Sequence, residues 1–83
     1  MELKILSVNV QGIGTIEKRL DLFNYLKAKN CDIYCLQDVH STTSTENFIE
    51  SQWGSHCLFS SHSSNSRGVA VLFNKHIDYL FIH

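Results

Sequence analysis

Two short apolar runs, separated by a helical pattern, constrain the fold of this chain more than any other feature. The runs are LKILSVNV at residues 3–10 and DIYCLQ at residues 32–37. Both are short, mainly apolar runs, and the first is rich in branched residues, which is typical of strands buried on both faces of a sheet. A strand, a helix and a second strand in this order predict parallel neighbouring strands joined by a right-handed crossover. We therefore expect an α/β fold.

The connecting helix is expected over residues 16–29. Its apolar residues follow spacings of four, three and three, which place them in one stripe along a helix. They are Ile16, Leu20, Phe23 and Leu26. Thr15 precedes this stripe and is expected to cap the helix through its hydroxyl, and Asn30 is expected to end it in a left-handed conformation.

The rest of the chain reads as short strands joined by polar segments. We expect a surface loop over residues 39–47, a short helix over residues 46–51 and a turn at Lys75 and His76. Three further strands are expected, over residues 55–60, 68–74 and 77–82. No internal repeat or linker divides the chain, so the sequence predicts one domain over residues 1–83, with about one sheet and one main helix.

The composition and charge narrow the function classes. The formal net charge of the 83 residues is -1, so no basic excess marks a free-standing nucleic-acid binder. The three cysteines are odd in number, no signal peptide is evident, and no apolar stretch approaches the roughly 18 residues that span a bilayer. We therefore expect an intracellular, reduced chain with no membrane partner.

Polar side chains end the two expected parallel strands. Asn9 and Asp38 occupy those positions, and the carboxyl ends of parallel strands lie at the same edge of a sheet, where α/β proteins tend to bind ligands. Amide and carboxylate oxygens are the donors that Mg²⁺ prefers, with only one or two carboxylates from the protein. The alternative is that Asn9 and Asp38 simply begin turns, as both residue types often do.

Four motifs resemble a known enzyme family. They are SVNVQG at residues 7–12, CLQDVH at 35–40, QWG at 52–54 and GVAVL at 68–72, the last preceded by Arg67. In this order they resemble the endonuclease/exonuclease/phosphatase family, most closely the apurinic-type endonuclease domain of non-LTR (LINE-type) retrotransposons. That family has a strand ending in N-x-N-G or N-x-Q-G, a helix, a strand ending in Leu/Ile-Gln-Glu-Thr, and later a Gly-Val-Ala-Ile/Val-Leu strand. The resemblance covers nearly the whole chain.

The resemblance implies a function and a set of site residues. Asn9 would orient the metal or the scissile phosphate, Asp38 would replace the metal-binding Glu of the family, and Gln11 and Gln37 would support them. The implied cofactor is Mg²⁺ or Mn²⁺, and the implied reaction is hydrolysis of DNA phosphodiester bonds at a retrotransposon target site. A reverse transcriptase region in the same polyprotein and action in the nucleus are further implications. Asp38 departs from the pattern because its side chain is one methylene shorter than that of Glu.

The resemblance also implies that these residues form only part of a domain. The family folds as a DNase I-like α/β sandwich of two sheets, and it uses a later Asp-His pair and a later Asp-x-Asn segment that this sequence does not show. We therefore expect an N-terminal fragment that is inactive alone. Two alternatives remain: a non-catalytic relic or interaction module, and a fragment of another family phosphodiesterase acting on abasic DNA, sphingomyelin or inositol phosphates.

Other chemistry is less well supported by the sequence. A zinc site is disfavoured because Cys35 lies within an expected strand and Cys57 has no paired ligand nearby. The GIG segment at residues 12–14 lacks the Lys-Ser/Thr pair of a phosphate-binding P-loop. His40 is expected to be a solvated loop residue, and Trp53 and Tyr34 are expected to be core residues.

Overall fold

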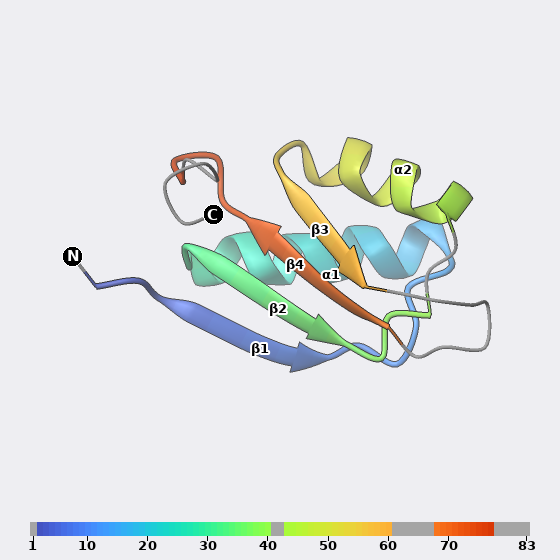
Figure 1. Cartoon of the computed structure of the whole chain (residues 1–83), viewed down its shortest axis with the longest axis horizontal. Coiled ribbons are helices and arrows are strands. Elements are labelled where there is room, and N and C mark those ends of the chain that lie inside the picture. Colours follow the sequence, from blue (N-terminus) through green and yellow to red (C-terminus); the bar gives the residue numbers. More distant parts are fainter. Residues whose placement is uncertain (1, 41–42, 61–67, 78–83) are drawn as a thin grey trace.

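The computed structural model describes residues 2–40, 43–60 and 68–77, which form two helices and one sheet of four strands (Figure 1). In chain order the elements are β1 (Ile5–Asn9), α1 (Ile16–Lys29), β2 (Ile33–Gln37), α2 (Thr43–Trp53), β3 (Cys57–Ser60) and β4 (Val69–Phe73). The α/β class and a single sheet are confirmed. The strand expected over residues 77–82 lies almost wholly outside the described residues.

The sheet has the strand order β1-β2-β4-β3 and is mixed. β1 and β2 are parallel, with Ile5 opposite Ile33 and Asn9 opposite Gln37, as predicted from the helix between them. β4 pairs antiparallel with both β2 and β3. The first two strands therefore end at the same edge of the sheet, and β1 is itself an outer strand.

Helix α1 begins and ends where the sequence predicted. The Thr15 hydroxyl accepts the Lys18 N–H at 3.3 Å, and Asn30 has the left-handed φ of 52° that closes the helix. The predicted apolar stripe is only partly correct. Phe23 and Leu26 are buried, whereas Ile16 and Leu20 are 52% and 49% exposed.

The reason for this difference is the rotation of α1 about its axis. Arg19, not Leu20, is turned inward, and it is 7% exposed. Its guanidinium group donates to the carbonyl of Ile13 and to the side chain of Gln52, so a polar residue occupies part of the buried face. Apolar spacing alone does not reveal such a contact, because Gln52 is 33 residues away in the sequence.

Helix α2 is longer than the sequence predicted. The prediction of a surface loop up to residue 47 is wrong from residue 43 onward, because the helix spans Thr43–Trp53. Its first turns are rich in Ser, Thr and Asn, which are weak helix formers. Burial of Ile49 and Trp53, one turn apart, holds this segment in the helix, and tertiary packing thus overrides the local preference.

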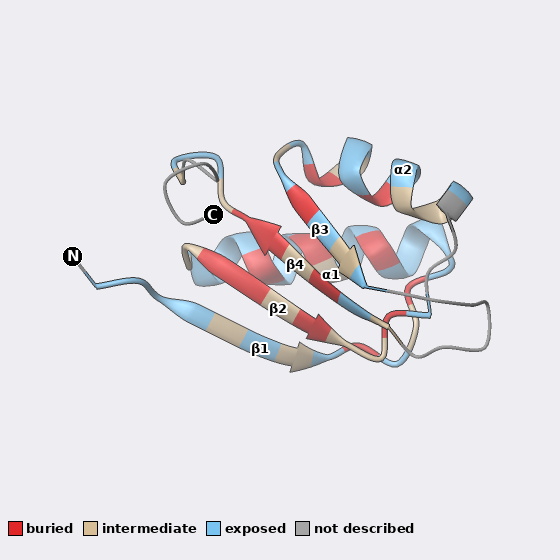
Figure 2. Cartoon of the chain, in the orientation of Figure 1, coloured by how far each residue is buried: buried red, intermediate tan, exposed pale blue. Residues whose placement is uncertain are grey.

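The core lies between the two helices and one face of the sheet (Figure 2). Residues from both helices and from β2 and β4 share this core. They include Phe23, Leu26, Tyr34, Leu36, Ile49, Trp53, Ala70 and Leu72. The Trp53 ring meets the rings of Phe23 and Tyr34 edge to face, each at 5.4 Å, which confirms that Trp53 and Tyr34 are core residues.

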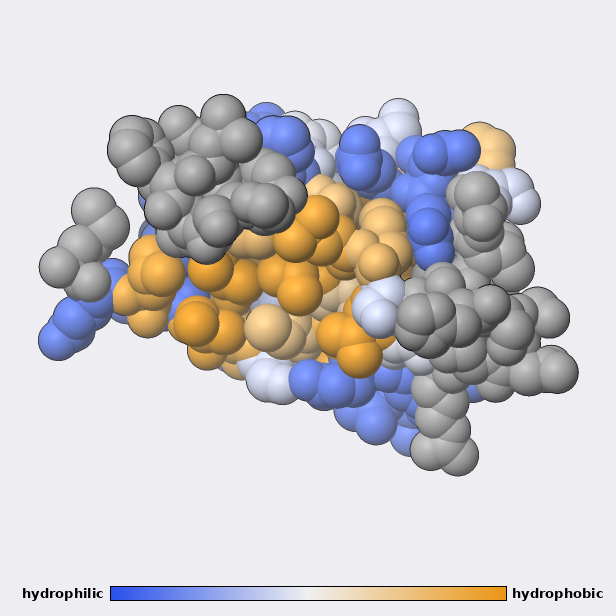
Figure 3. Space-filling model, viewed as in Figure 1, coloured by the Kyte–Doolittle hydropathy of each residue, from blue (hydrophilic) through white to orange (hydrophobic). Residues whose placement is uncertain are grey.

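No helix of the described residues covers the opposite face of the sheet, which is apolar (Figure 3). The prediction that the first strand is buried on both faces is wrong: exposure alternates along β1, and Ile5 is 59% exposed. Leu58 and Val69 are also exposed on this face, at 42% and 44%. Within the described parts of the chain, β1 has a strand neighbour on one side only and the helices lie on one face only, which leaves the other face open. Among the described residues, neither helix has the length and apolar character needed to cross a membrane.

Candidate functional site at the carboxyl ends of two parallel strands

The structure brings the predicted site residues together. Asn9 is the last residue of β1 and lies opposite Gln37 in the parallel register, and Asp38 follows directly after β2. This arrangement follows from the crossover through α1, which forces the two strands to run in the same direction.

The two segments that leave the strands stay hydrogen bonded to each other. The backbone N–H groups of Val10, Gly12 and Ile13 donate to the carbonyls of Gln37, Asp38 and Val39, at 3.0, 2.7 and 3.2 Å. This ladder extends the parallel pairing beyond the strands. The backbone around Asp38 is therefore held by hydrogen bonds.

Left-handed backbone conformations concentrate at this edge. Gln11, Asp38 and His40 have φ values of 51°, 60° and 56°, and Gly12, in the segment after β1, has 84°. A residue other than glycine costs roughly 1 kcal/mol or more in this region, and such residues cluster at functional sites and switch regions. The observed strain is a reason, independent of the motifs, to consider a function here.

The side chain of Asn9 forms a turn of its own. Its Oδ1 accepts the backbone N–H of Gln11 at 3.2 Å, which is the turn expected of an Asn in a purely structural role. Gln11 is exposed, and its carbonyl accepts from Nζ of Lys18 at 2.9 Å. No sequence pattern predicted Lys18 at this position. A positive charge from the first turn of α1 thus lies beside the candidate site.

Gln37 is tethered by a side-chain contact. Its Nε2 donates to the Ser7 hydroxyl across the β1–β2 pair. The alternation of the strands places Gln37 and Asn9 on the open face of the sheet. The side chain of Gln37 is thus held along the open face, against Ser7.

Asp38 is paired with His40, a contact that the sequence reading missed. Nε2 of His40 lies 2.6 Å from Oδ1 of Asp38, and the two side chains are 45% and 19% exposed. His40 is exposed, as expected, but it is not merely a solvated residue. The spacing of two residues was visible in the sequence, yet only the left-handed backbone at both positions turns the ring back onto the carboxylate.

The oxygen donors of the described residues at this edge do not form a closed metal site. The site offers one carboxylate, from Asp38, and the amide oxygen of Asn9, and the described residues contain no group of three His, Cys, Asp or Glu side chains suited to a metal. Mg²⁺ commonly keeps several waters and takes one or two carboxylates together with substrate phosphates. Both oxygens have protein partners, the His40 ring and the Gln11 N–H, that an ion would have to displace.

No protein-family model matches this chain, and no curated protein matches its sequence. The resemblance to the endonuclease/exonuclease/phosphatase family therefore rests on the four motifs alone. Three of them coincide with β1, β2 and β4, which are neighbours in the sheet.

Proposed function

We propose that this chain is part of a Mg²⁺-dependent phosphodiester-cleaving domain, similar to the endonucleases of non-LTR retrotransposons. The observation that carries the proposal is the meeting of Asn9 and Asp38 at one edge of the sheet, at the ends of parallel strands. Substrates commonly bind at this position in α/β proteins. The left-handed backbone at Asp38 supports the same site.

The proposed roles follow from the chemistry of each side chain. Asp38 binds the metal through its carboxylate once His40 moves aside, and Asn9 orients the scissile phosphate through its amide. Lys18, whose ammonium group is held at the Gln11 carbonyl, adds positive charge beside the phosphate. When bound, Mg²⁺ polarises the phosphate and stabilises the charge that develops as water attacks. The DNA substrate, the reverse transcriptase region and action in the nucleus remain part of this proposal.

A second candidate is a non-catalytic interaction module. Two observations favour it: Asn9 already completes a turn with Gln11, and Asp38 is already paired with His40. The exposed apolar face of the sheet also suits association with another protein surface. A phosphodiesterase of the same family that acts on abasic DNA, sphingomyelin or inositol phosphates is an enzymatic alternative.

Metal binding by the chain itself separates these candidates. Chemical shifts of backbone amides are followed by NMR during a Mg²⁺ titration, with Asp38→Asn as the test variant and Asp21→Asn as the matched control. Asp21 is an exposed acidic residue of α1, away from the sheet edge. We expect saturable shifts at Asp38 and Gly12 that Asp38→Asn abolishes and Asp21→Asn preserves. No saturable shift at this edge would favour the interaction module.

Catalysis requires a separate test. Sequencing the transcript and the genomic locus past codon 83 decides whether the frame continues into an Asp-x-Asn segment and an Asp-His pair. For a longer chain with these segments, we expect Mg²⁺-dependent nicking of supercoiled plasmid that Asp38→Ala and Asn9→Ala each reduce by at least about tenfold. The 83-residue chain is expected to show no nicking. Equal traces of nicking in wild type and variants would indicate contamination and contradict the assigned roles.

A further inference from the structure

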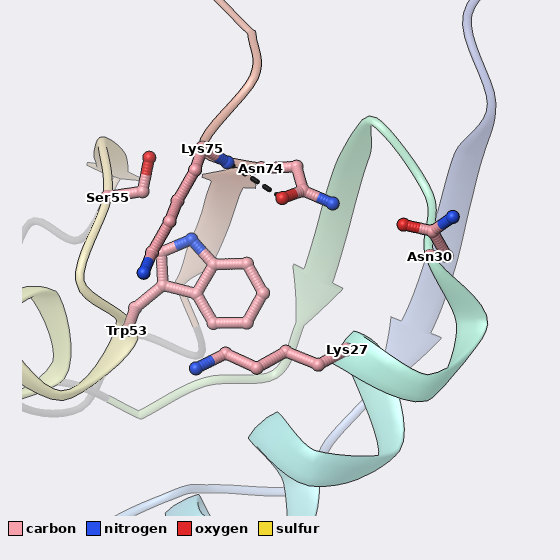
Figure 4. Close-up of a pocket in the computed structure, with 6 residues that line it drawn as sticks. All are labelled: Lys27, Asn30, Trp53, Ser55, Asn74 and Lys75. Atoms are coloured by element: carbon pink, nitrogen blue, oxygen red, sulfur yellow. Dashed lines mark hydrogen bonds between the residues drawn. The ribbon is translucent and has the colours of Figure 1, made fainter.

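A pocket of about 250 Å³ lies at the end of the sheet opposite to Asn9 and Asp38 (Figure 4). Asn74, which lines it, follows β4 directly, and β4 ends beside the beginning of β2 because Phe73 pairs with Ile33. The pocket is enclosed by the carboxyl ends of both helices and by the turn after β4. Its lining residues are Lys27, Asn30, Trp53, Ser55, Asn74 and Lys75.

Two lysines from different elements face this pocket. Lys27 comes from the last turn of α1 and Lys75 from the turn after β4, and Figure 4 shows their side chains on either side of the Trp53 indole. Nζ of Lys27 lies 5.4 Å from the centroid of that ring, within range of a cation–π contact. In the described part of the chain, neither lysine forms an ion pair. Two positive charges therefore face one small space without a carboxylate partner.

The remaining polar groups of the pocket divide into fixed and free ones. Asn74 is fixed: its Nδ2 donates to the Cys31 carbonyl at 2.8 Å, and its Oδ1 accepts the backbone N–H of Lys75 at 2.7 Å. This holds the turn from which Lys75 projects. The Ser55 hydroxyl and the Asn30 amide bond to no other described residue, so both remain available as donors.

Trp53 forms a rigid wall of the pocket. Its Nε1 donates to the Phe73 carbonyl at 2.8 Å, and the residue is 3% exposed. The indole is thus fixed in the core while its outer edge reaches the pocket.

Negative charges near the pocket do not cancel the two lysines. The carboxyl ends of α1 and α2 each contribute the equivalent of about half a negative charge, which together is about half of what the two lysines supply. The Asp32 carboxylate does not line the pocket and is hydrogen bonded to the His76 ring and the Lys4 N–H. Glu50 lines a separate hollow beyond Ser55. The residues that line the pocket therefore carry a net positive charge.

We propose that this pocket binds the phosphate group of a small phosphorylated molecule. Lysine ammonium groups bind phosphate as point charges, and hydroxyl and amide donors complete its hydrogen bonds. The volume of about 250 Å³ lies just below the roughly 300–1,000 Å³ of sites for drug-sized ligands, which favours a small molecule. A polynucleotide is disfavoured because its backbone needs an extended basic groove, and the chain carries a net charge of -1.

The test uses the fluorescence of Trp53, the single tryptophan of the chain. The 83-residue chain is titrated with inorganic phosphate and with glycerol 3-phosphate, at constant ionic strength maintained with sodium chloride. Lys27→Gln and Lys75→Gln remove one charge each. Lys29→Gln is the matched control, because Lys29 lies on the same helix but its Nζ is placed over the Tyr25 ring, 5.1 Å from the centroid. Circular dichroism checks that each variant is folded.

We expect a saturable signal with a Kd tighter than about 10 mM, weakened roughly tenfold by Lys27→Gln and by Lys75→Gln and unchanged by Lys29→Gln. No saturable signal with either phosphate compound would overturn the proposal. Equal weakening by Lys29→Gln would do the same, since it would reveal a general charge effect. Tighter binding of a single-stranded DNA oligonucleotide than of glycerol 3-phosphate, lost in the same variants, would show a nucleic-acid surface and also refute it.

Discussion

Arg19 offers a sharp test of how the interior of this protein is held together. Its side chain is 7% exposed, and among the described residues no carboxylate pairs with it. Instead, Nε donates to Oε1 of Gln52 at 2.5 Å and Nη1 donates to the Ile13 carbonyl at 3.0 Å. One guanidinium group thereby joins the loop before α1, α1 itself and α2.

Replacement of Gln52 by leucine removes one acceptor and leaves the buried charge in place. A hydrogen bond to a charged group contributes about 1.5–3 kcal/mol, so we expect the free energy of unfolding to fall by about 2 kcal/mol. Unfolding entropy near 2.1 cal/mol/K per residue gives about 170 cal/mol/K for 83 residues, so the melting temperature should fall by roughly 12 °C. Arg19→Met removes both hydrogen bonds of Arg19 but also removes the buried charge. We expect it to lower the free energy of unfolding by about 1 kcal/mol.

The decisive quantity is the stability of the double variant. Once Arg19 is methionine, Gln52 has no charge to satisfy, and the second change, Gln52→Leu, should add almost nothing. We therefore expect the double variant to be more stable than Gln52→Leu alone, measured by urea unfolding and by thermal unfolding at pH 7. A double variant whose loss equals the sum of the two single losses would refute this reasoning, because it would show that the contacts act independently.

Three further predictions follow from single contacts. The Lys4 N–H and the His76 ring lower the pKa of the Asp32 carboxyl. The charged carboxylate therefore stabilises the folded state at neutral pH, and this contribution is lost as the pH falls below about 4. Asp32→Asn should lower the free energy of unfolding in urea at pH 7, and should lower it much less at pH 3. Trp53→Phe removes a hydrogen bond and buried ring area and should cost about 2–3 kcal/mol in the same assay, and a loss below about 0.5 kcal/mol would contradict its place in the core. Burial raises the pKa of the Cys57 thiol to about 12, so in the folded protein a thiol reagent at pH 8 should label it far more slowly than the other two cysteines; equal rates would disprove its burial.

The helix between the parallel strands was the most predictable part of the fold. Its capping residue, Thr15, and its left-handed terminal residue, Asn30, act through contacts within a few residues, so local sequence suffices to place them. Parallel pairing of β1 and β2 follows from the same local pattern, because a helix between two strands leaves little other choice. The meeting of Asn9 and Asp38 at one edge was predictable for that reason.

The parts that the sequence did not predict depend on contacts between distant residues. Helix α2 forms because Ile49 and Trp53 are buried against other elements, which local propensity does not report. The pairing of His40 with Asp38 needs left-handed backbone at both residues, and neither is a glycine that would signal it. The exposure of β1 depends on its place at the edge of the sheet.

The sequence by itself determined the α/β class, the parallel pair and the position of the candidate site. These follow from the spacing of apolar residues and from the helix that connects the two strands. The tertiary structure alone decided which face of α1 is buried, which face of the sheet stays open, and which charges meet. Lys27 and Lys75 lie 48 positions apart in the sequence, and only the packing of α1 against the turn after β4 brings them to one pocket. Electrostatic sites of this kind depend on distance in space, whereas secondary structure depends mainly on distance along the chain.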